Sequence, residues 1–156
     1  MIYSLISIVL LVGLDRFSKI LAVKYLSGGT PVTVIPHILG LRYTENTGAA
    51  FSMLSKNTDF LIIITIVSMA FLVYLIFIKK YGTAIERALM TVVLAGGIGN
   101  LIDRIVSGYV VDYFEFLFMN FAVFNVADIY ITVGITLYLV YALCEEYKNK
   151  KDKKNG

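Results

Sequence analysis

The sequence predicts an all-α integral membrane protein: a bundle of four transmembrane helices with a small extracytoplasmic β-sheet and a loop lid. Hydrophobic residues make up 58% of its 156 residues and charged residues 16%, whereas soluble domains average about 45–50% and about 25%. The apolar residues gather in four runs, and β-type residues occupy the segment between the first two. With two Pro and a single Cys, a collagen-like or disulfide-stapled chain is excluded.

Four helices are expected, over residues 2–24, 59–79, 87–106 and 126–146. The clearest run, 60–78, holds 19 uncharged residues, close to the about 20 that a helix needs to cross about 30 Å of hydrocarbon. The other three runs are shorter and are bounded by Asp15, Asp103 and Asp128. Each can span only if its acid lies near a membrane face or inside a protein cavity.

The distribution of lysines predicts the orientation of the helices. Five lysines lie in the tail 147–156, and Lys79 and Lys80 follow the second run. The positive-inside rule therefore places both segments in the cytoplasm. Four spans put the N-terminus in the cytoplasm too, and they leave the segments 25–58 and 107–125 on the outer side.

The outer segment 28–58 is expected to form the small sheet. Its sequence GGTP at 28–31 is a turn signal, and residues 32–35 and 39–44 are short runs of β-type residues. Such a sheet would lie on the membrane surface. Because no repeat or linker divides the chain, we expect a single membrane domain over residues 1–156.

Acidic residues toward the outer ends of the helices are the main functional signal. A carboxylate at membrane depth costs roughly 2.5–3.5 kcal/mol on insertion scales, so acids there are retained mainly for a purpose. Four such residues belong to three helices and the segment 107–125, and all converge on one face of the membrane: Asp15, Asp103, Asp112 and Asp128.

Two spacings within the helices pair these acids with bases. Asn100 shares a helix face with Asp103 and Arg104, three and four residues further on. An arginine at this depth needs a partner, so Asp103 and Arg104 fit a structural ion pair as well as a site. Asp15 and Lys19, four residues apart, favour a structural pair.

Asp112 and Asp128 are the candidate catalytic pair. Asp112 lies among apolar and aromatic residues, whereas Asn125 is a candidate N-cap that places Asp128 in the first turn of a helix. Complementing the helix dipole is the alternative role for Asp128. Two carboxyls in a low-dielectric site share one proton, as in an aspartic protease. One then takes a proton from water, and the other polarises the scissile carbonyl. We expect Asp128 to ionise first and Asp112 to hold the proton.

Five sequence blocks, in order, resemble those of lipoprotein signal peptidase, also called signal peptidase II or prolipoprotein signal peptidase. The blocks are DRFSK at 15–19, ENTGAAF at 45–51, GNLIDR at 99–104, VVDYF at 110–114 and FNVAD at 124–128. The resemblance covers most of the chain, from Asp15 to about Gly134. One block alone would be a weak signal, but five in order in a four-span chain are highly specific. The family usually has Gln where this chain has Arg16.

The resemblance implies an aspartic endopeptidase of the bacterial cytoplasmic membrane. Such an enzyme cuts a prolipoprotein N-terminal to a diacylglyceryl-modified Cys. The catalytic pair of the family maps onto Asp112 and Asp128. The substrate-binding and supporting candidates are Asp15, Lys19, Asn46, Gly48, Asn100, Asp103, Arg104 and Asn125. The loop of Asn46 and residues 48–51 is expected to act as a lid.

The same resemblance implies sensitivity to cyclic depsipeptides such as globomycin and a reaction without metal or cofactor. The single His and single Cys also argue against a zinc site. Further partners expected are membrane lipid and the prolipoprotein, with no nucleic acid and with the chain acting as a monomer.

Two other functions remain open from the residues alone. Clustered aspartates also bind Mg²⁺ in a metal-dependent membrane phosphotransferase, although here they are spread over separate segments. Intramembrane acids also serve a small ion-coupled transporter, although no inverted repeat is visible. Chelator sensitivity would identify the first alternative and proton flux the second.

Overall fold

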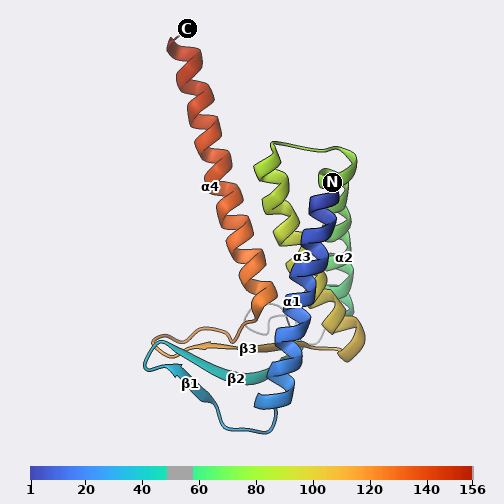
Figure 1. Cartoon of the computed structure of the whole chain (residues 1–156), viewed down its shortest axis with the longest axis vertical. Helices are drawn as coiled ribbons and strands as arrows, with labels where there is room; N and C mark the ends of the chain where they lie inside the picture. The colour runs from blue at the N-terminus through green and yellow to red at the C-terminus, as the bar shows by residue number, and fades with distance from the viewer. Residues whose placement is uncertain (49–57, 156) are drawn as a thin grey trace.

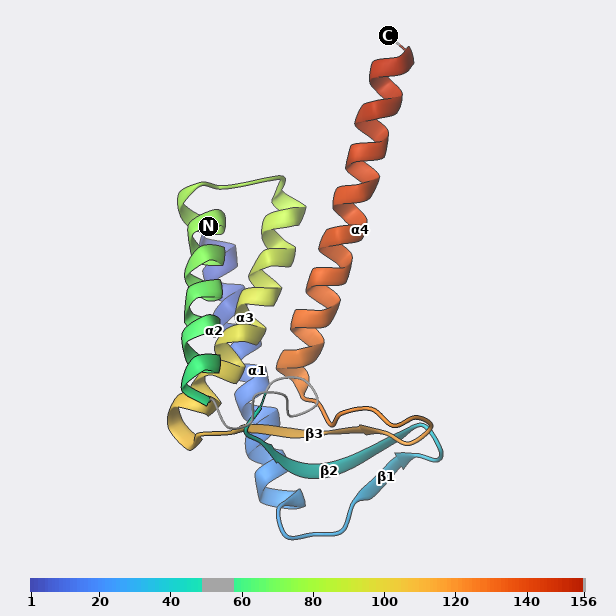
Figure 2. The same cartoon turned by 180° about the vertical axis from the view of Figure 1, so that it is seen from behind.

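The computed structural model describes residues 1–48 and 58–155 (Figure 1). Helices α1, α2 and α3 lie side by side, and α4 leans away from them toward the C-terminus (Figures 1 and 2). Both termini lie toward one end of the bundle, and the sheet lies at the other. In chain order the elements are α1 (Ile2–Leu26), β1 (Val32–Ile35), β2 (Leu39–Asn46), α2 (Thr58–Val73), the π-helical turn η2 (Tyr74–Ile78), α3 (Ala84–Ser107), β3 (Val110–Phe116) and α4 (Val126–Asn155).

Three helical segments of the described chain are long and apolar enough to cross a membrane: Asp59–Ile78, Ala84–Ser107 and Val126–Lys151. At about 1.5 Å per residue, each is about 30 Å long or longer. Helix α1 has a similar length but carries four charged residues in its second half, Asp15, Arg16, Lys19 and Lys24. The expected membrane fold with a small sheet is therefore confirmed in outline, with three candidate spans rather than the four predicted.

Large apolar side chains cover the outer surfaces of the helices. Val9, Ile63, Phe71 and Leu139, among others, are more than half exposed. This is the reverse of a soluble domain, in which a helix turns its apolar side chains toward the core. A hydrocarbon environment removes the cost of this exposure, because such side chains gain nothing from avoiding lipid.

With η2 counted as the end of α2, two helices, α3 and α4, differ from the predicted bounds by more than two residues at one end. Helix α3 begins at Ala84 instead of residue 87, because Thr83 and Glu86 form a capping box at its N-terminus. Helix α4 continues to Asn155, so most of the predicted tail 147–156 is helical. The lysines of the tail are good helix formers, and residues 147–155 include no Gly or Pro. Lys150 also pairs with Glu146 at 2.6 Å.

Within residues 1–48 and 58–155, the sheet has three antiparallel strands in the order β1-β2-β3. The sequence predicted β1 and β2 within 28–58, but β3 was not expected as a strand. Its residues, Val110–Phe116, are β-branched and aromatic at most positions, which is typical of strands. The register places Thr44 opposite Asp112 and Asn46 opposite Val110. The third strand therefore brings an aspartate of the second outer segment beside residues of the first.

Glycines let α3 approach its neighbours closely. A Cβ on Gly96 would lie 2.5 Å from the carbonyl oxygen of Ala127 in α4, and one on Gly99 would meet the carboxylate of Asp15 in α1. Real side-chain carbons do not come so close to an oxygen, so both positions require glycine. This close packing brings polar residues of α1, α3 and α4 together.

Candidate active site

Asp112 lies in β3 with 1% of its surface exposed. Two side-chain amides donate hydrogen bonds to its carboxyl group. The Nδ2 of Asn46 lies 2.9 Å from Oδ2, and the Nδ2 of Asn125 lies 2.6 Å from Oδ1. Burial raises the pKa of Asp112 to about 6, and the negative charge of Asp128 adds to the rise, whereas the two amides lower it.

Asp128 lies in the first turn of α4, where it shares a reciprocal cap with Asn125. The backbone N–H of Asn125 donates to Oδ2 of Asp128 at 3.1 Å, and the backbone N–H of Asp128 donates to Oδ1 of Asn125 at 3.0 Å. The N-cap predicted from the sequence is therefore present. Because Nδ2 of Asn125 also donates to Asp112, this one residue bonds both carboxyl groups, that of Asp128 through its backbone N–H and that of Asp112 through its side chain.

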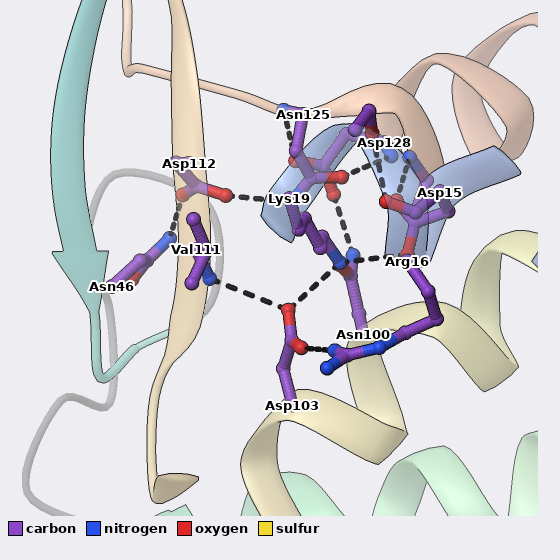
Figure 3. A network of polar contacts seen from close by, with 12 residues as sticks. Asp15, Arg16, Lys19, Asn46, Asn100, Asp103, Val111, Asp112, Asn125 and Asp128 are labelled. Atoms are coloured by element: carbon purple, nitrogen blue, oxygen red, sulfur yellow. Dashed lines mark hydrogen bonds and ion pairs between the residues drawn. The ribbon is translucent and has the colours of Figure 1, made fainter. Parts of the chain in front are cut away.

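Asn100, on α3, completes the link. Its Nδ2 donates to Oδ1 of Asp128 at 2.8 Å. Its Oδ1 accepts from Nδ2 of Asn125 at 3.1 Å and from Nζ of Lys19 at 2.9 Å. Residues of β3, α3 and α4, far apart in the sequence, thus form one hydrogen-bonded group around the two carboxyls (Figure 3).

Behind this group, α1 and α3 share a cluster of buried charges. Nζ of Lys19 lies 3.0 Å from Asp15 and 2.8 Å from Asp103. Asp103 also pairs with Arg16 (Figure 3) and accepts a bond from the backbone N–H of Val111 at 3.4 Å. Pairing of this kind reduces the cost of burying each charge. The i, i+4 pair of Asp15 and Lys19 that the sequence predicted is present.

The carboxylate of Asp15 also joins α1 to the start of α4. Its Oδ1 accepts a hydrogen bond from the backbone N–H of Ala127 at 3.0 Å. Ala127 directly precedes Asp128, so this bond fixes the first turn of α4 relative to α1. Asp15 thereby supports Asp128 without touching it.

Arg104 points toward the loop that follows β2 and does not pair with Asp103. Its guanidinium donates to the carbonyl oxygen of Gly48 at 2.8 Å, while the backbone N–H of Gly48 donates to Oδ1 of Asn46 at 2.9 Å. Among the described residues, Arg104 and Asp103 do not form the ion pair that the sequence allowed, because Lys19 and Arg16 occupy that carboxylate. Residues 49–51 of the expected lid lie outside the described residues.

The two carboxyls face a groove of about 650 Å³ between α2, α3, α4 and β3. Its polar end is formed by Asn46, Asn100, Arg104, Asp112 and Asp128. The rest of the lining is largely apolar, with Ile64, Met69, Phe116 and Val133 among its residues. In the part of the chain that the structure describes, no group of three or more His, Cys, Asp and Glu is arranged to hold a metal ion.

Sequence reasoning missed the role of Tyr113 and Ser18 in holding β3. The phenol of Tyr113 donates to Oγ of Ser18 at 2.7 Å, and this hydroxyl in turn donates to the carbonyl oxygen of Asp15 at 2.7 Å. Burial raises the pKa of Tyr113 to about 12, so the phenol keeps its proton at neutral pH. Asp112 is the neighbour of Tyr113, so this contact holds the candidate catalytic strand against α1. The partners are 95 residues apart, and no spacing rule links them.

Fold and site together define a helical membrane protein with two carboxyl groups at the polar end of an apolar groove. Both carboxyl groups are hydrogen-bonded to Asn125. Comparison with known proteins narrows this class. The sequence profile of the family described as signal peptidase (SPase) II matches residues 7–144.

Relatives named lipoprotein signal peptidase match nearly the full chain. The Enterococcus faecalis protein is 44% identical over 99% of this chain and 95% of its own length. The Latilactobacillus sakei protein is 40% identical over 94% and 96%. A solved structure described as a bacterial membrane enzyme superimposes with a TM-score of 0.84 at 30% identity, over 96% of this chain and 92% of its own. The chain belongs to the signal peptidase II family, and it is a protease.

Proposed function

We propose that this protein removes the signal peptide from bacterial prolipoproteins by cutting N-terminal to the diacylglyceryl-modified Cys, with Asp112 and Asp128 as its catalytic pair. The observation that carries this assignment is the pair of buried carboxyl groups, both bonded to Asn125, at the end of an apolar groove. The names of the relatives support the substrate. The geometry supports an aspartic mechanism.

In this mechanism the two carboxyls share one proton and act on a water molecule between them. Asp128, which accepts two N–H donors at the start of α4, takes a proton from the water. Asp112, whose pKa is raised to about 6, holds the shared proton and donates a hydrogen bond to the scissile carbonyl. The attacking hydroxide then adds to the carbonyl carbon, and the proton on Asp112 passes to the leaving amine.

The groove suits a substrate that is itself a membrane helix. Its apolar walls can receive the signal peptide and the acyl chains, while its polar end meets the peptide bond. A peptide unwound at this depth has no water for its backbone groups. Asn100, Asn125 and Arg104 supply donors and acceptors there, and the loop from Asn46 onward would act as a lid over the bound peptide.

We further propose that α1 is the fourth span of a single domain over 1–156. Its charges Asp15 and Lys19 are buried against protein, which is how ionisable residues are accommodated in a membrane. Both termini lie toward one end of the bundle and the sheet at the other (Figure 1). The lysine-rich end of α4 supports a cytoplasmic location for both termini under the positive-inside rule, which puts the site toward the outer face in this proposal.

The protein acts as a monomer in contact with membrane lipid, without cofactor or nucleic acid. Cyclic depsipeptides such as globomycin bind in the same groove.

Incubation of the purified protein with a diacylglyceryl prolipoprotein tests the proposed function. Cleavage before the modified Cys is expected, with inhibition by globomycin and full activity in excess EDTA. Loss of activity in EDTA would favour the metal-dependent alternative. Cleavage of the prolipoprotein without the diacylglyceryl group at an equal rate would contradict the substrate assignment.

A further inference from the structure

A second pocket lies on the other side of β3 from the catalytic groove. Its volume is about 380 Å³, and its walls come from α1, α3 and the start of β3. Alternation along the strand separates the two cavities, because successive side chains point to opposite faces. Val110 and Asp112 line the groove, whereas Tyr109 and Val111 line the second pocket, which we name the α1–α3 pocket.

The α1–α3 pocket carries an excess of positive charge. Arg16, Ile20 and Lys24 follow one another at intervals of four, so they share one face of α1. Three cations line the pocket, Arg16, Lys19 and Lys24, against one lining carboxylate, Asp103. Even with the neighbouring Asp15 counted, three positive charges meet two negative ones.

Of the three cations, Lys24 is the one without a carboxylate partner among the described residues. Arg16 and Lys19 are held by the carboxylates of the buried cluster. Lys24 is exposed, and within the described residues its ammonium makes no ion pair, lying instead 5.1 Å from the ring centroid of Tyr25. Arg16 keeps a third of its side chain exposed, so its remaining N–H donors are accessible from the pocket. An anion entering here would meet two accessible cations.

The level of the pocket along the helices indicates where such an anion comes from. Lys24 lies in the last turn of α1, and Ser107 is the last residue of α3. With α1 as the fourth span proposed above, its 25 residues exceed the hydrocarbon thickness of about 30 Å, so its last turn lies in the headgroup region. Ile20, one turn before Lys24, and Val23, directly beside it, line the same pocket and are 57% and 41% exposed, which offers an apolar surface to acyl chains.

We propose that the α1–α3 pocket binds the phosphate group of an anionic phospholipid. The phosphate accepts hydrogen bonds from Lys24, Arg16 and the exposed hydroxyl of Ser107, and the acyl chains follow Ile20 and Val23. Basic pockets between membrane helices recognise lipid headgroups by this combination of charge and apolar surface. This lipid site is separate from the catalytic groove. The proposal therefore holds whichever bond the enzyme cleaves.

Native mass spectrometry of the full chain in detergent tests the proposal with three probes: phosphatidylglycerol, phosphatidylcholine with the same acyl chains, and inorganic phosphate. We expect one tightly held phosphatidylglycerol per chain and weaker binding of the zwitterionic lipid. Lys24→Gln should weaken phosphatidylglycerol binding about fivefold, the factor that corresponds to about 1 kcal/mol for one basic residue near a membrane surface. Lys24→Arg should restore the affinity.

Lys79→Gln is the matched control. Lys79 is also a lysine at a helix end with its ammonium near a tyrosine ring, 5.4 Å from the centroid of Tyr81, but it lines neither cavity. It should leave binding unchanged. Equal binding of the two lipids, or equal losses in Lys24→Gln and Lys79→Gln, would overturn the proposal. Displacement of the lipid by inorganic phosphate in the same concentration range would assign the pocket to free phosphate and contradict a lipid site.

Discussion

Removing the amide of Asn46 should move the pH dependence of cleavage in a direction that the structure specifies. The Nδ2 of Asn46 donates to Asp112 at 2.9 Å, and this bond lowers a pKa that burial raises to about 6. In Asn46→Ala the carboxylate form loses that donor, so the pKa of Asp112 rises. Because the proposed mechanism needs a protonated Asp112, activity should persist to higher pH.

The size of this change follows from the geometry. A hydrogen bond to a charged group contributes about 1.5–3 kcal/mol, and about 1.4 kcal/mol corresponds to one pH unit. Since Asn46 is only half-buried, solvent screens part of the interaction, and the lower end of the range applies. The alkaline limb of the kcat/KM profile should therefore move up by about one pH unit.

The assay is the pH profile of kcat/KM for a diacylglyceryl lipopeptide, which reports the free enzyme. Tyr43→Phe is a suitable control, because it removes a hydrogen bond of 2.9 Å to Glu45 on the same strand but away from Asp112. Its profile should match the wild type. An alkaline limb in Asn46→Ala that stays in place or moves to lower pH would refute a protonated Asp112.

Three further predictions concern stability. Gly99→Ala places a Cβ against the carboxylate of Asp15, so thermal unfolding in detergent should show a loss of about 1–3 kcal/mol; an unchanged melting temperature would contradict the close packing. Asn125→Ala removes the cap of α4 and leaves buried N–H and carboxyl groups without partners, so chemical denaturation should show a loss of about 2–4 kcal/mol, and a loss below about 0.5 kcal/mol would contradict this bonding. Folding raises the pKa of Asp112 from 3.8 to about 6, so its contribution to stability is full below about pH 4 and declines as the pH rises through about 6. Asp112→Asn should remove that decline, and a variant as pH-dependent as the wild type would show that another group causes it.

The apolar runs predicted the helices because transmembrane length is fixed by the bilayer. The same runs did not predict where α3 begins or where α4 ends. The capping box of Thr83 and Glu86 extends α3 backward, and its signal was present in the sequence. The strand β3 was missed because its pairing with β2 joins residues far apart in the chain, such as Thr44 and Asp112. Its β-branched and aromatic residues are compatible with a strand, but nothing local specified its partner.

The candidate site was predicted as a set of residues and not as an arrangement. Spacing gave the pair of Asp15 and Lys19, which the structure confirms. Spacing also suggested that Arg104 pairs with Asp103, whereas Arg104 turns to the Gly48 carbonyl. The partners of Asp103 are instead Arg16 and Lys19, both on α1 and more than 80 residues away in the sequence. Contacts of this kind depend on how α1 and α3 pack, and one sequence does not contain that information in any local pattern.

Cleavage of a diacylglyceryl prolipoprotein by Asp112→Asn and Asp128→Asn tests the catalytic pair most directly. Asp59→Asn is the matched control, because Asp59 also lies in the first turn of a helix but is exposed and lines neither cavity. Each dyad variant should fold and should lose at least about a hundredfold in rate, the scale of losing one acid–base group, while the control keeps wild-type turnover. Near-normal turnover in either dyad variant would contradict the assignment.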